Sequence, residues 1–194
     1  MNRLFEKQMQ DILKNEYPDF MKALEQPAVK AFYLNPHKKE AIKYLNKEFI
    51  QPHVVVKDGY YFNYEKYPLG KSPFFSCGLY YIQEPSAMLV THFLNIQKDD
   101  YILDMCAAPG GKTCAAASQL SEDGLMIAND IVPLRAKILS ENVERFGLKN
   151  TIVTNCDPLV FENQLKGFFD KIILDAPCSG EGMFRKSDAA IETW

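Results

Sequence analysis

From Pro85 onward, short apolar runs alternate with amphipathic segments, and this alternation restricts the fold more than any other feature of the chain. The apolar runs cover residues 101–105, 125–129, 151–154 and 169–174. Helical segments over residues 112–120 and 133–146 separate the first three runs, and Pro133 and Gly147 are residues that favour the start and the stop of a helix. Strands that alternate with helices form βαβ units with a parallel, helix-covered sheet. The sequence therefore predicts an α/β fold whose sheet has four parallel strands and is incomplete within these 194 residues.

The first 70 residues follow a different pattern, in which short helices are mixed with strands. The pattern predicts helices over residues 2–16, 18–26 and 36–46, a strand over Ala31–Leu34, and a hairpin that joins Val54–Val56 to Tyr60–Phe62. We therefore expect a small α+β domain over residues 1–70 and the α/β domain over residues 85–194. Residues 71–84 contain Pro73 and Gly78 and are predicted to form a linker or a loop over a cleft.

Composition excludes several classes of protein. The net charge of −3 gives no global basic footprint of the kind that nucleic-acid-binding domains often carry. The five cysteines contain no C-x-x-C pair and there are three histidines, so neither a metal site nor a disulfide framework is expected. The N-terminus is charged throughout and no stretch is apolar enough to span a membrane. We expect a cytoplasmic protein without a membrane partner.

A glycine turn, DMCAAPGGKT over residues 104–113, joins the first parallel strand to the next helix. Such a turn lets backbone N–H groups approach a ligand closely. Cys106 stands where a nucleotide-binding P-loop needs glycine, and the pair Gly110-Gly111 does not complete the dinucleotide fingerprint G-x-G-x-x-G. The turn is therefore predicted to bind a ligand without a pyrophosphate.

Aspartates follow the next three strands and are predicted to lie at the same edge of the sheet. Asp130 follows the second strand, Asp157 the third and Asp175 the fourth. Ligands of open α/β sheets bind outside the carboxyl ends of the strands. Any one of these aspartates could simply cap a helix or a turn. Taken together with the glycine turn, they favour a ligand site.

Asp175 begins the segment DAPCSGEG, which brings a carboxylate and the thiol of Cys178 into one loop, followed by Ser179. A free cysteine is more often a core residue than a reactive one. Because this cysteine follows a strand end beside the predicted ligand site, we interpret it as part of an active site.

These segments, in this order and spacing, resemble the S-adenosyl-L-methionine-dependent RNA cytosine-5 methyltransferases of the NOL/NOP/Sun family, and in particular its RsmF-like members, which act on 16S ribosomal RNA. The resemblance covers essentially the whole chain and implies a Rossmann-like methyltransferase domain that is cut after four strands. It implies that the cofactor S-adenosyl-L-methionine lies near Asp130 (ribose), Arg135, Asp157 (adenine), Asp175 and the turn formed by Cys106, Ala107, Ala108, Pro109, Gly110, Gly111 and Lys112.

The resemblance also implies the chemistry. The C5 atom of cytosine becomes nucleophilic when a thiolate adds to C6, and a base must then remove the C5 proton. In the family the attacking cysteine lies in a later Thr-Cys motif, and the Pro-Cys cysteine, here Cys178, assists product release. Asp175 is expected to bind the polar edge of the base and Lys112 to favour nearby anions. The chain ends before that later motif, so we expect these 194 residues to be inactive alone.

Two other functions remain open. The chain could be a non-catalytic module that binds S-adenosylmethionine or RNA, or its target could be transfer RNA. An incomplete sheet also leaves the fourth strand with an open edge, so the isolated chain is expected to self-associate.

Overall fold

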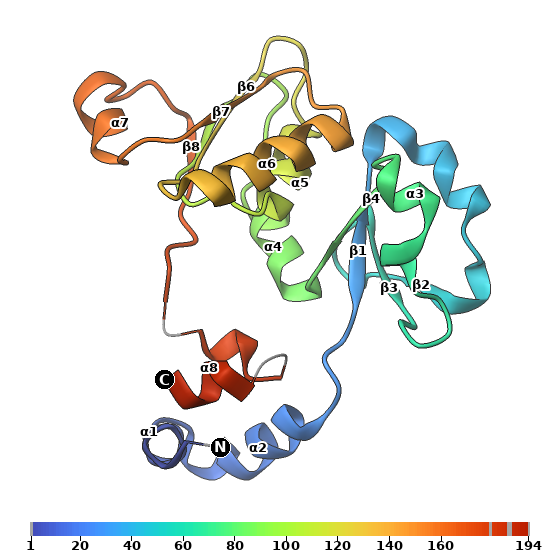
Figure 1. Cartoon of the computed structure of the whole chain (residues 1–194), viewed down its shortest axis with the longest axis vertical. Coiled ribbons are helices and arrows are strands. Elements are labelled where there is room, and N and C mark those ends of the chain that lie inside the picture. The colour runs from blue at the N-terminus through green and yellow to red at the C-terminus, as the bar shows by residue number, and fades with distance from the viewer. Residues whose placement is uncertain (1, 179, 186–187, 194) are drawn as a thin grey trace. The chain divides into compact units, whose positions relative to one another are not determined.

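The computed structural model describes residues 2–178, 180–185 and 188–193 (Figure 1). The chain divides into two compact units. The larger unit is Lys30–Ala176, and the smaller unit combines Met1–Val29 with Pro177–Trp194. The larger unit contains both sheets and every predicted site residue except Cys178.

The first sheet of the larger unit is antiparallel, with the strand order β2-β3-β1-β4. Its strands are β1 (Ala31–Leu34), β2 (Ile50–Pro52), β3 (Gly59–Phe62) and β4 (Tyr80–Gln83). The predicted strand Ala31–Leu34 is confirmed. The predicted pairing of Val54–Val56 is wrong, because β2 pairs with β3 instead. The Nδ1 atom of His53 accepts hydrogen bonds from the backbone N–H groups of residues 55 and 56, which bends this segment into a turn.

Short helices connect and cover this sheet. They are η2 (Pro36–Tyr44), η3 (Lys47–Phe49), η4 (Leu69–Lys71) and α3 (Pro73–Ser76). The helix predicted over residues 36–46 is a 3-10 helix that ends at Tyr44 and is interrupted at Lys38, where the backbone has non-helical dihedral angles. The side chain of Asn35 caps its start by accepting from the backbone N–H of His37.

The predicted linker, residues 71–84, is packed against the second half of the unit. A side chain at Gly78 would place its Cβ only 1.8 Å from the backbone oxygen of Arg145, so glycine is required for this close approach. The guanidinium of Arg145 donates to the backbone oxygen of Phe75 at 2.8 Å and lies over its ring. The same stretch ends in β4, which pairs with β1. The domain division at residues 71–84 stays a prediction.

The second sheet is parallel and has the order β7-β6-β5-β8. Its strands are β5 (Tyr101–Asp104), β6 (Leu125–Asn129), β7 (Thr151–Thr154) and β8 (Lys171–Ile173). The predicted parallel sheet of four strands is confirmed, although β8 is shorter than the predicted run 169–174. The spatial order places β8 beside β5, so the first and last strands of the series are neighbours.

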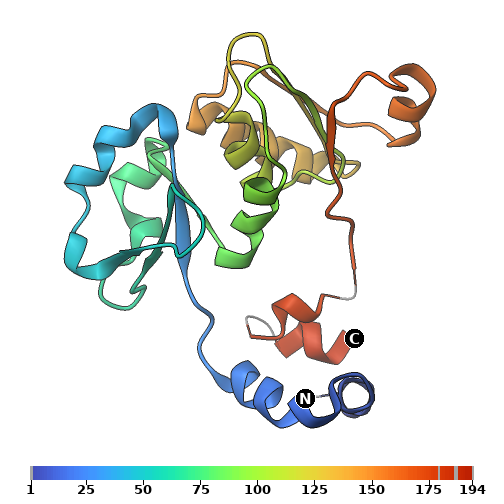
Figure 2. The ribbon, with the colours of Figure 1, turned by 180° about the vertical axis from the view of Figure 1, so that it is seen from behind.

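Helices cover this parallel sheet as expected for an α/β fold. They are α4 (Pro85–Phe93), α5 (Gly111–Ala117), α6 (Pro133–Phe146) and α7 (Leu159–Gln164). Helix α4 lies between the two sheets and contacts β1, β3 and α5 (Figure 2). A buried cluster that includes Tyr33, Met88, Cys114 and Phe146 joins the antiparallel sheet to α4, α5 and α6. The antiparallel sheet is therefore packed against helices that also cover the parallel sheet.

The smaller unit is helical. It contains α1 (Arg3–Leu13), η1 (Lys14–Glu16), α2 (Tyr17–Glu25), η5 (Glu181–Met183) and α8 (Asp188–Thr193). Phe5 is buried and its ring lies 4.9 Å from that of Phe184 and 6.2 Å from that of Phe20. Elsewhere in α1 burial is limited, and Ile12 is 60% exposed. Among the helices of the described residues, none has the length and hydrophobicity needed to cross a membrane.

Candidate functional site

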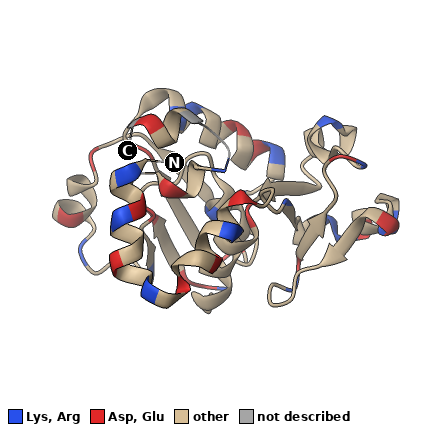
Figure 3. Ribbon diagram, turned by 90° about the horizontal axis from the view of Figure 1, so that it is seen from below, with Lys and Arg blue, Asp and Glu red and all other residues tan. Residues whose placement is uncertain are grey.

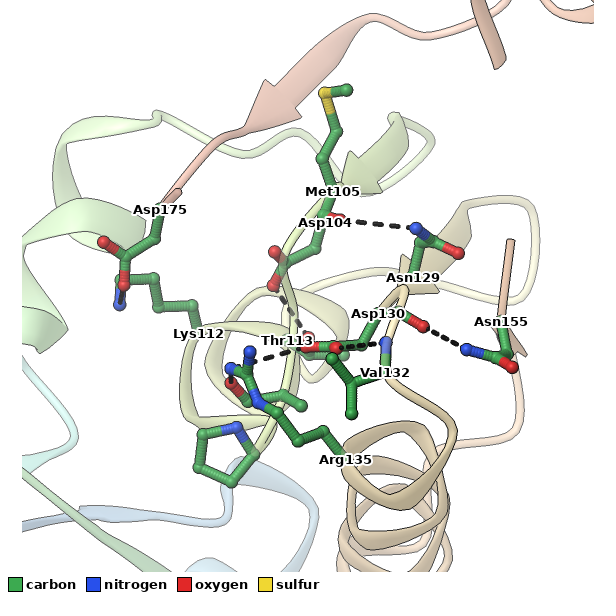
Figure 4. Close-up of polar contacts among 12 residues, drawn as sticks. Asp104, Met105, Lys112, Thr113, Asn129, Asp130, Val132, Arg135, Asn155 and Asp175 are labelled. Carbon is green, nitrogen blue, oxygen red and sulfur yellow. Dashed lines mark hydrogen bonds and ion pairs between the residues drawn. The ribbon is translucent and has the colours of Figure 1, made fainter. Parts of the chain in front are cut away.

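Three carboxylates lie at one edge of the parallel sheet (Figure 4). Asp104 is the last residue of β5, Asp130 directly follows the neighbouring strand β6, and Asp175 follows β8 on the other side of β5. The strands are parallel, so their carboxyl ends meet at the same edge. The structure thus brings together two predicted site residues, Asp130 and Asp175, and places between them a third that the motif analysis left without a role.

Asp104 is that third carboxylate, and it is 1% exposed. Its Oδ2 accepts a 2.8 Å hydrogen bond from the hydroxyl of Thr113, while Oδ1 has no hydrogen-bond partner among the described residues. Burial raises the pKa of Asp104 to about 6, although the Thr113 hydroxyl and the nearby Lys112 charge oppose this rise. An aspartate at a strand end before a glycine turn was the available sequence signal for this residue.

The glycine turn is held in place by α6. The backbone oxygens of Ala108 and Pro109 accept hydrogen bonds, each 2.8 Å long, from Arg135 and Asn142 respectively. Gly110 has a φ of 114°, which side-chain-bearing residues rarely adopt, and this conformation starts α5. The predicted turn therefore has a defined shape, and Arg135 supports it from the neighbouring helix.

Lys112 and Asp175 form an ion pair, with Nζ and Oδ2 separated by 2.5 Å. The lysine side chain is 19% exposed and the carboxylate is 62% exposed. The pair joins the start of α5 to the segment after β8. Two predicted catalytic groups are therefore in direct contact, with the carboxylate on the solvent side.

Asp130 is 1% exposed. Its Oδ1 accepts from the backbone N–H of Val132 at 3.0 Å. Its Oδ2 lies 3.4 Å from Nη2 of Arg135, an ion-pair distance, but no described group makes a hydrogen bond to it. The carboxylate is thus held rigidly and keeps one oxygen available as an acceptor.

Asp157 has a structural role in the described chain. It is exposed, and its Oδ1 accepts from the backbone N–H of Leu159 at 2.9 Å, at the start of α7. Asn129, which sequence reasoning missed, instead ties the strand ends together. Its fully buried amide accepts from Thr154 at 2.9 Å and donates to the backbone oxygen of Cys156 at 3.0 Å. The role of Asp157 beside an adenine stays a prediction.

The cysteines differ in accessibility. Cys178 is exposed and belongs to the smaller unit, and Ser179 lies outside the described residues. Cys106 is partly buried, and burial together with the nearby Asp130 charge raises the pKa of its thiol. Cys114 follows Thr113 and so forms a Thr-Cys step, but it is fully buried and burial raises its pKa to about 12. Cys114 is therefore no candidate nucleophile.

A cavity of about 210 Å³ opens beside the carboxylates of Asp104 and Asp175. Its walls come from the end of β4, the start of α4, the glycine turn and the segment after β8, and are lined by Tyr81, Ile82, Gln83, Glu84, Ala87, Asp104, Cys106, Ala107, Ala108, Pro109, Gly111, Lys112 and Asp175. Most residues of the predicted glycine turn and the Lys112–Asp175 pair are among them. Asp130, Arg135 and Asp157 lie outside this lining. Within the described residues, no group of three or more His, Cys, Asp or Glu side chains could hold a metal ion.

Two models of known protein families together match most of the chain. The family model described as 16S rRNA methyltransferase RsmB/F matches residues 91–192, and the model described as the N-terminal domain of 16S rRNA methyltransferase RsmF matches residues 1–85. Ribosomal RNA small subunit methyltransferase F of Vibrio vulnificus is 42% identical over 131 residues, which is 66% of this chain and 28% of that protein. The protein of the same name from Vibrio parahaemolyticus is 34% identical over 185 residues, or 91% of this chain and 39% of that protein.

Among solved structures, a methyltransferase homologue from Pyrococcus horikoshii is 32% identical and has a TM-score of 0.77. The match covers 91% of this chain and 59% of that one. The chain thus spans less than two thirds of the length of each of these relatives.

Proposed function

Because the chain belongs to the RsmB/F family of 16S rRNA methyltransferases, we propose that its residues take part in transferring a methyl group from S-adenosyl-L-methionine to C5 of a cytosine in 16S ribosomal RNA. The chain covers the N-terminal domain and part of the catalytic domain of that family. The observation that carries the proposal is the edge of the parallel sheet, where the buried carboxylates of Asp104 and Asp130 each keep one oxygen without a hydrogen bond among the described residues and a cavity opens beside Asp104.

The residues present fit this cofactor. S-adenosylmethionine has ribose hydroxyls and an ammonium group, which are hydrogen-bond donors. The free oxygens of Asp130 and Asp104 are acceptors whose burial is costly until a donor meets them. Asp130 would hold the ribose, with Arg135 orienting its carboxylate from 3.4 Å away. The turn from Cys106 to Lys112 would surround the methionine part.

When bound, the cofactor supplies an electrophilic methyl group. The side chains of this chain would act on the base. Asp175, which is largely exposed, accepts a hydrogen bond from the exocyclic amino group of cytosine. Lys112 donates to that carboxylate and fixes its direction. Cys178 follows Asp175 by three residues in sequence and serves as the thiol that assists release of the product.

Ribosomal RNA is proposed as the partner on the strength of the family, with the cytoplasm as the compartment in which ribosomes are made. Basic and acidic residues are interspersed over the described part of the chain (Figure 3), which agrees with the net charge of −3. RNA binding by this chain is therefore expected to rest on local contacts, with a weak dependence on salt.

Isothermal titration calorimetry with S-adenosylmethionine tests the proposal. We expect binding by the 194-residue chain and a loss of at least roughly tenfold in affinity for Asp130→Ala, because the buried acceptor for the ribose is removed. Asp99→Ala removes an exposed carboxylate and serves as the control. Circular dichroism verifies that both variants fold. If the wild-type chain does not bind the cofactor, the proposed function fails.

A binding experiment with RNA separates the proposal from its rivals. Filter binding with fragments of 16S ribosomal RNA and with unmodified transfer RNA, each with and without S-adenosylhomocysteine, measures the preferred partner. Preference for the ribosomal fragment supports the proposal. Preference for transfer RNA favours the other substrate, and RNA binding by a chain that ignores the cofactor favours a scaffold.

A further inference from the structure

The side chain of Arg145, near the end of α6, connects two parts of the larger unit. Its Nη1 donates to the backbone oxygen of Phe75 in α3 at 2.8 Å. Its Cζ lies 4.2 Å from the centre of the Phe75 ring and 5.8 Å from the centre of the Tyr81 ring. On the other side, Nη2 donates to Oδ1 of Asn142 at 2.6 Å. The guanidinium is therefore fixed by the antiparallel half of the unit and bound to an amide of its own helix.

The amide of Asn142 continues this connection to the glycine turn. Its Nδ2 donates to the backbone oxygen of Pro109 at 2.8 Å, while its Oδ1 accepts from Arg145. A guanidinium can only donate and a backbone oxygen can only accept, so the amide satisfies both neighbours in just one of its two orientations. Arg145 thereby selects the orientation in which Asn142 donates to Pro109.

These two side chains lie behind the cavity wall. Pro109 and Tyr81 line the cavity, whereas Asn142 and Arg145 lie outside its lining. Neither of the latter two is placed to touch a ligand in the cavity. Any effect that they have on ligand binding must pass through a residue of the wall, and the hydrogen bond to Pro109 provides the direct route.

We propose that Asn142 and Arg145 are positioning residues of the methyltransferase site, with Arg145 acting through Asn142 to hold the backbone of Pro109 in its ligand-binding shape. A hydrogen bond from a guanidinium is stronger than one between neutral groups, so the amide is held firmly. A turn that already has its bound shape loses less conformational freedom when a ligand binds. Because Phe75 fixes Arg145, α3 contributes to the shape of the cofactor site without touching the cofactor. This inference rests on the proposed function, since it concerns binding of the same cofactor.

Asn142→Asp separates the two contacts of the amide. The aspartate still accepts from Arg145, but it has no donor for the backbone oxygen of Pro109. Calorimetry with the 194-residue chain should show that the affinity for S-adenosylhomocysteine falls by roughly threefold to tenfold, the equivalent of one lost hydrogen bond. The urea midpoint of unfolding should stay close to the wild-type value, because an ion pair with Arg145 offsets that loss.

An exposed asparagine provides the matched control for this variant. Asn63→Asp makes the same change of charge and keeps the oxygen that accepts from the backbone N–H of Lys66. Both the affinity for S-adenosylhomocysteine and the urea midpoint should remain at the wild-type values.

Arg145→Met tests whether the arginine acts through the amide. It removes both donated hydrogen bonds and keeps an unbranched side chain, so it should weaken S-adenosylhomocysteine binding as Asn142→Asp does. In the background of Asn142→Ala, which has no amide, Arg145→Met should change the affinity by less than about twofold. Lys137→Met, at an exposed position of α6, is the control and should leave the affinity unchanged.

Three results would overturn this inference while leaving the proposed function intact. The first is wild-type affinity in Asn142→Asp, since the hydrogen bond to Pro109 would then not matter for binding. The second is a parallel loss of affinity and stability in Asn142→Asp, which would mark a general structural role. The third is an undiminished effect of Arg145→Met in the Asn142→Ala background, because Arg145 would then act by another route, such as Tyr81. If the wild-type chain does not bind S-adenosylhomocysteine, the proposed function and this inference both fail.

Discussion

Thr113 donates a 2.8 Å hydrogen bond to one carboxylate oxygen of Asp104, while the other oxygen of that buried carboxylate has no partner in the described chain. The carboxylate of Asp104 therefore has a hydrogen bond at only one of its two oxygens. Such a group lowers the stability of the free protein and becomes satisfied when a donor binds.

Asp104→Asn is expected to stabilise the chain without ligand at neutral pH. Because the folded-state pKa of about 6 lies above the unfolded value, the folded chain holds the proton more tightly, and the free energy of unfolding falls as pH rises from about 4 to about 6. Asparagine carries no charge to bury. The substitution should therefore raise the free energy of unfolding by an amount on the order of 2 kcal/mol at pH 7.5 and by little at pH 4. Urea unfolding at both pH values measures the difference. A gain that is the same at both would contradict the explanation.

Cofactor affinity is expected to fall below pH 6. Protonation of Asp104, whose pKa is about 6, removes the charge that would hold the ligand ammonium. From pH 7 to pH 5 the affinity of the wild-type chain for S-adenosylhomocysteine should drop by roughly tenfold. Asp104→Asn should bind weakly with little dependence on pH over this range. Calorimetry at the two pH values measures the affinities. A wild-type affinity that does not change with pH would argue against a role of Asp104 in binding the ammonium.

Lys171→Met is expected to destabilise the larger unit by about 3 kcal/mol. Nζ of Lys171 lies 2.5 Å from Oδ2 of the buried Asp100, which also accepts from the backbone N–H of Gln97. Burial opposes the charged form of Asp100, but these two partners hold its pKa below the usual value. Stability from this group is therefore present above about pH 4 and is lost as pH falls further.

The exposed pair between Lys43 and Glu40 provides the control for that variant. Lys43→Met should leave the free energy of unfolding nearly unchanged, because water screens exposed ion pairs. Chemical unfolding at pH 7 measures both variants. Equal effects of the two substitutions would show that the Asp100 pair contributes nothing beyond an exposed one.

Asn129→Ala is expected to cost about 2 to 4 kcal/mol, because it leaves several partly buried partners at the ends of β5 and β7 without their hydrogen bonds to this side chain. Asn155→Ala is the comparison, since this exposed side chain makes one hydrogen bond, to the backbone oxygen of Asp130, and should cost about 1 kcal/mol. Urea unfolding ranks the two, and the reverse order would refute the role assigned to Asn129.

The isolated 194-residue chain is expected to self-associate through β8. Within the described residues this strand pairs on one side only, with β5, and Ile172 is 53% exposed. Light scattering should show an average mass that rises with concentration, and Ile172→Lys should suppress the rise because a charged residue blocks edge pairing. Ile138→Lys, on the exposed side of α6, is the control and should leave the rise in mass unchanged. A monodisperse monomer at high concentration would refute this expectation.

Local signals in the sequence are enough to predict many elements of the part of the chain that forms the parallel sheet. The bounds of β6, α6 and β7 agree with the predicted ones, because apolar runs, Pro133 and Gly147 act on their immediate neighbours. The prediction of a hairpin strand at Val54–Val56 was wrong, and the reason is also local. It does not show in the pattern of apolar residues. A side chain, His53, competes for the backbone N–H groups that a strand would have used.

The residue types of the candidate site were also visible in the sequence, since Asp130, Asp175 and the glycine turn follow strands at recognisable spacings. The sequence does not show which of these side chains contact one another. Gln83 lies against Gly111 and Asp175 pairs with Lys112 only because β4 approaches the turn and β8 lies beside β5. Hydrogen bonds and burial depend on the distance between atoms in space, which residues far apart in sequence do not encode locally. The half-satisfied carboxylate of Asp104 and the unpaired amide of Gln83 are therefore properties of the tertiary structure.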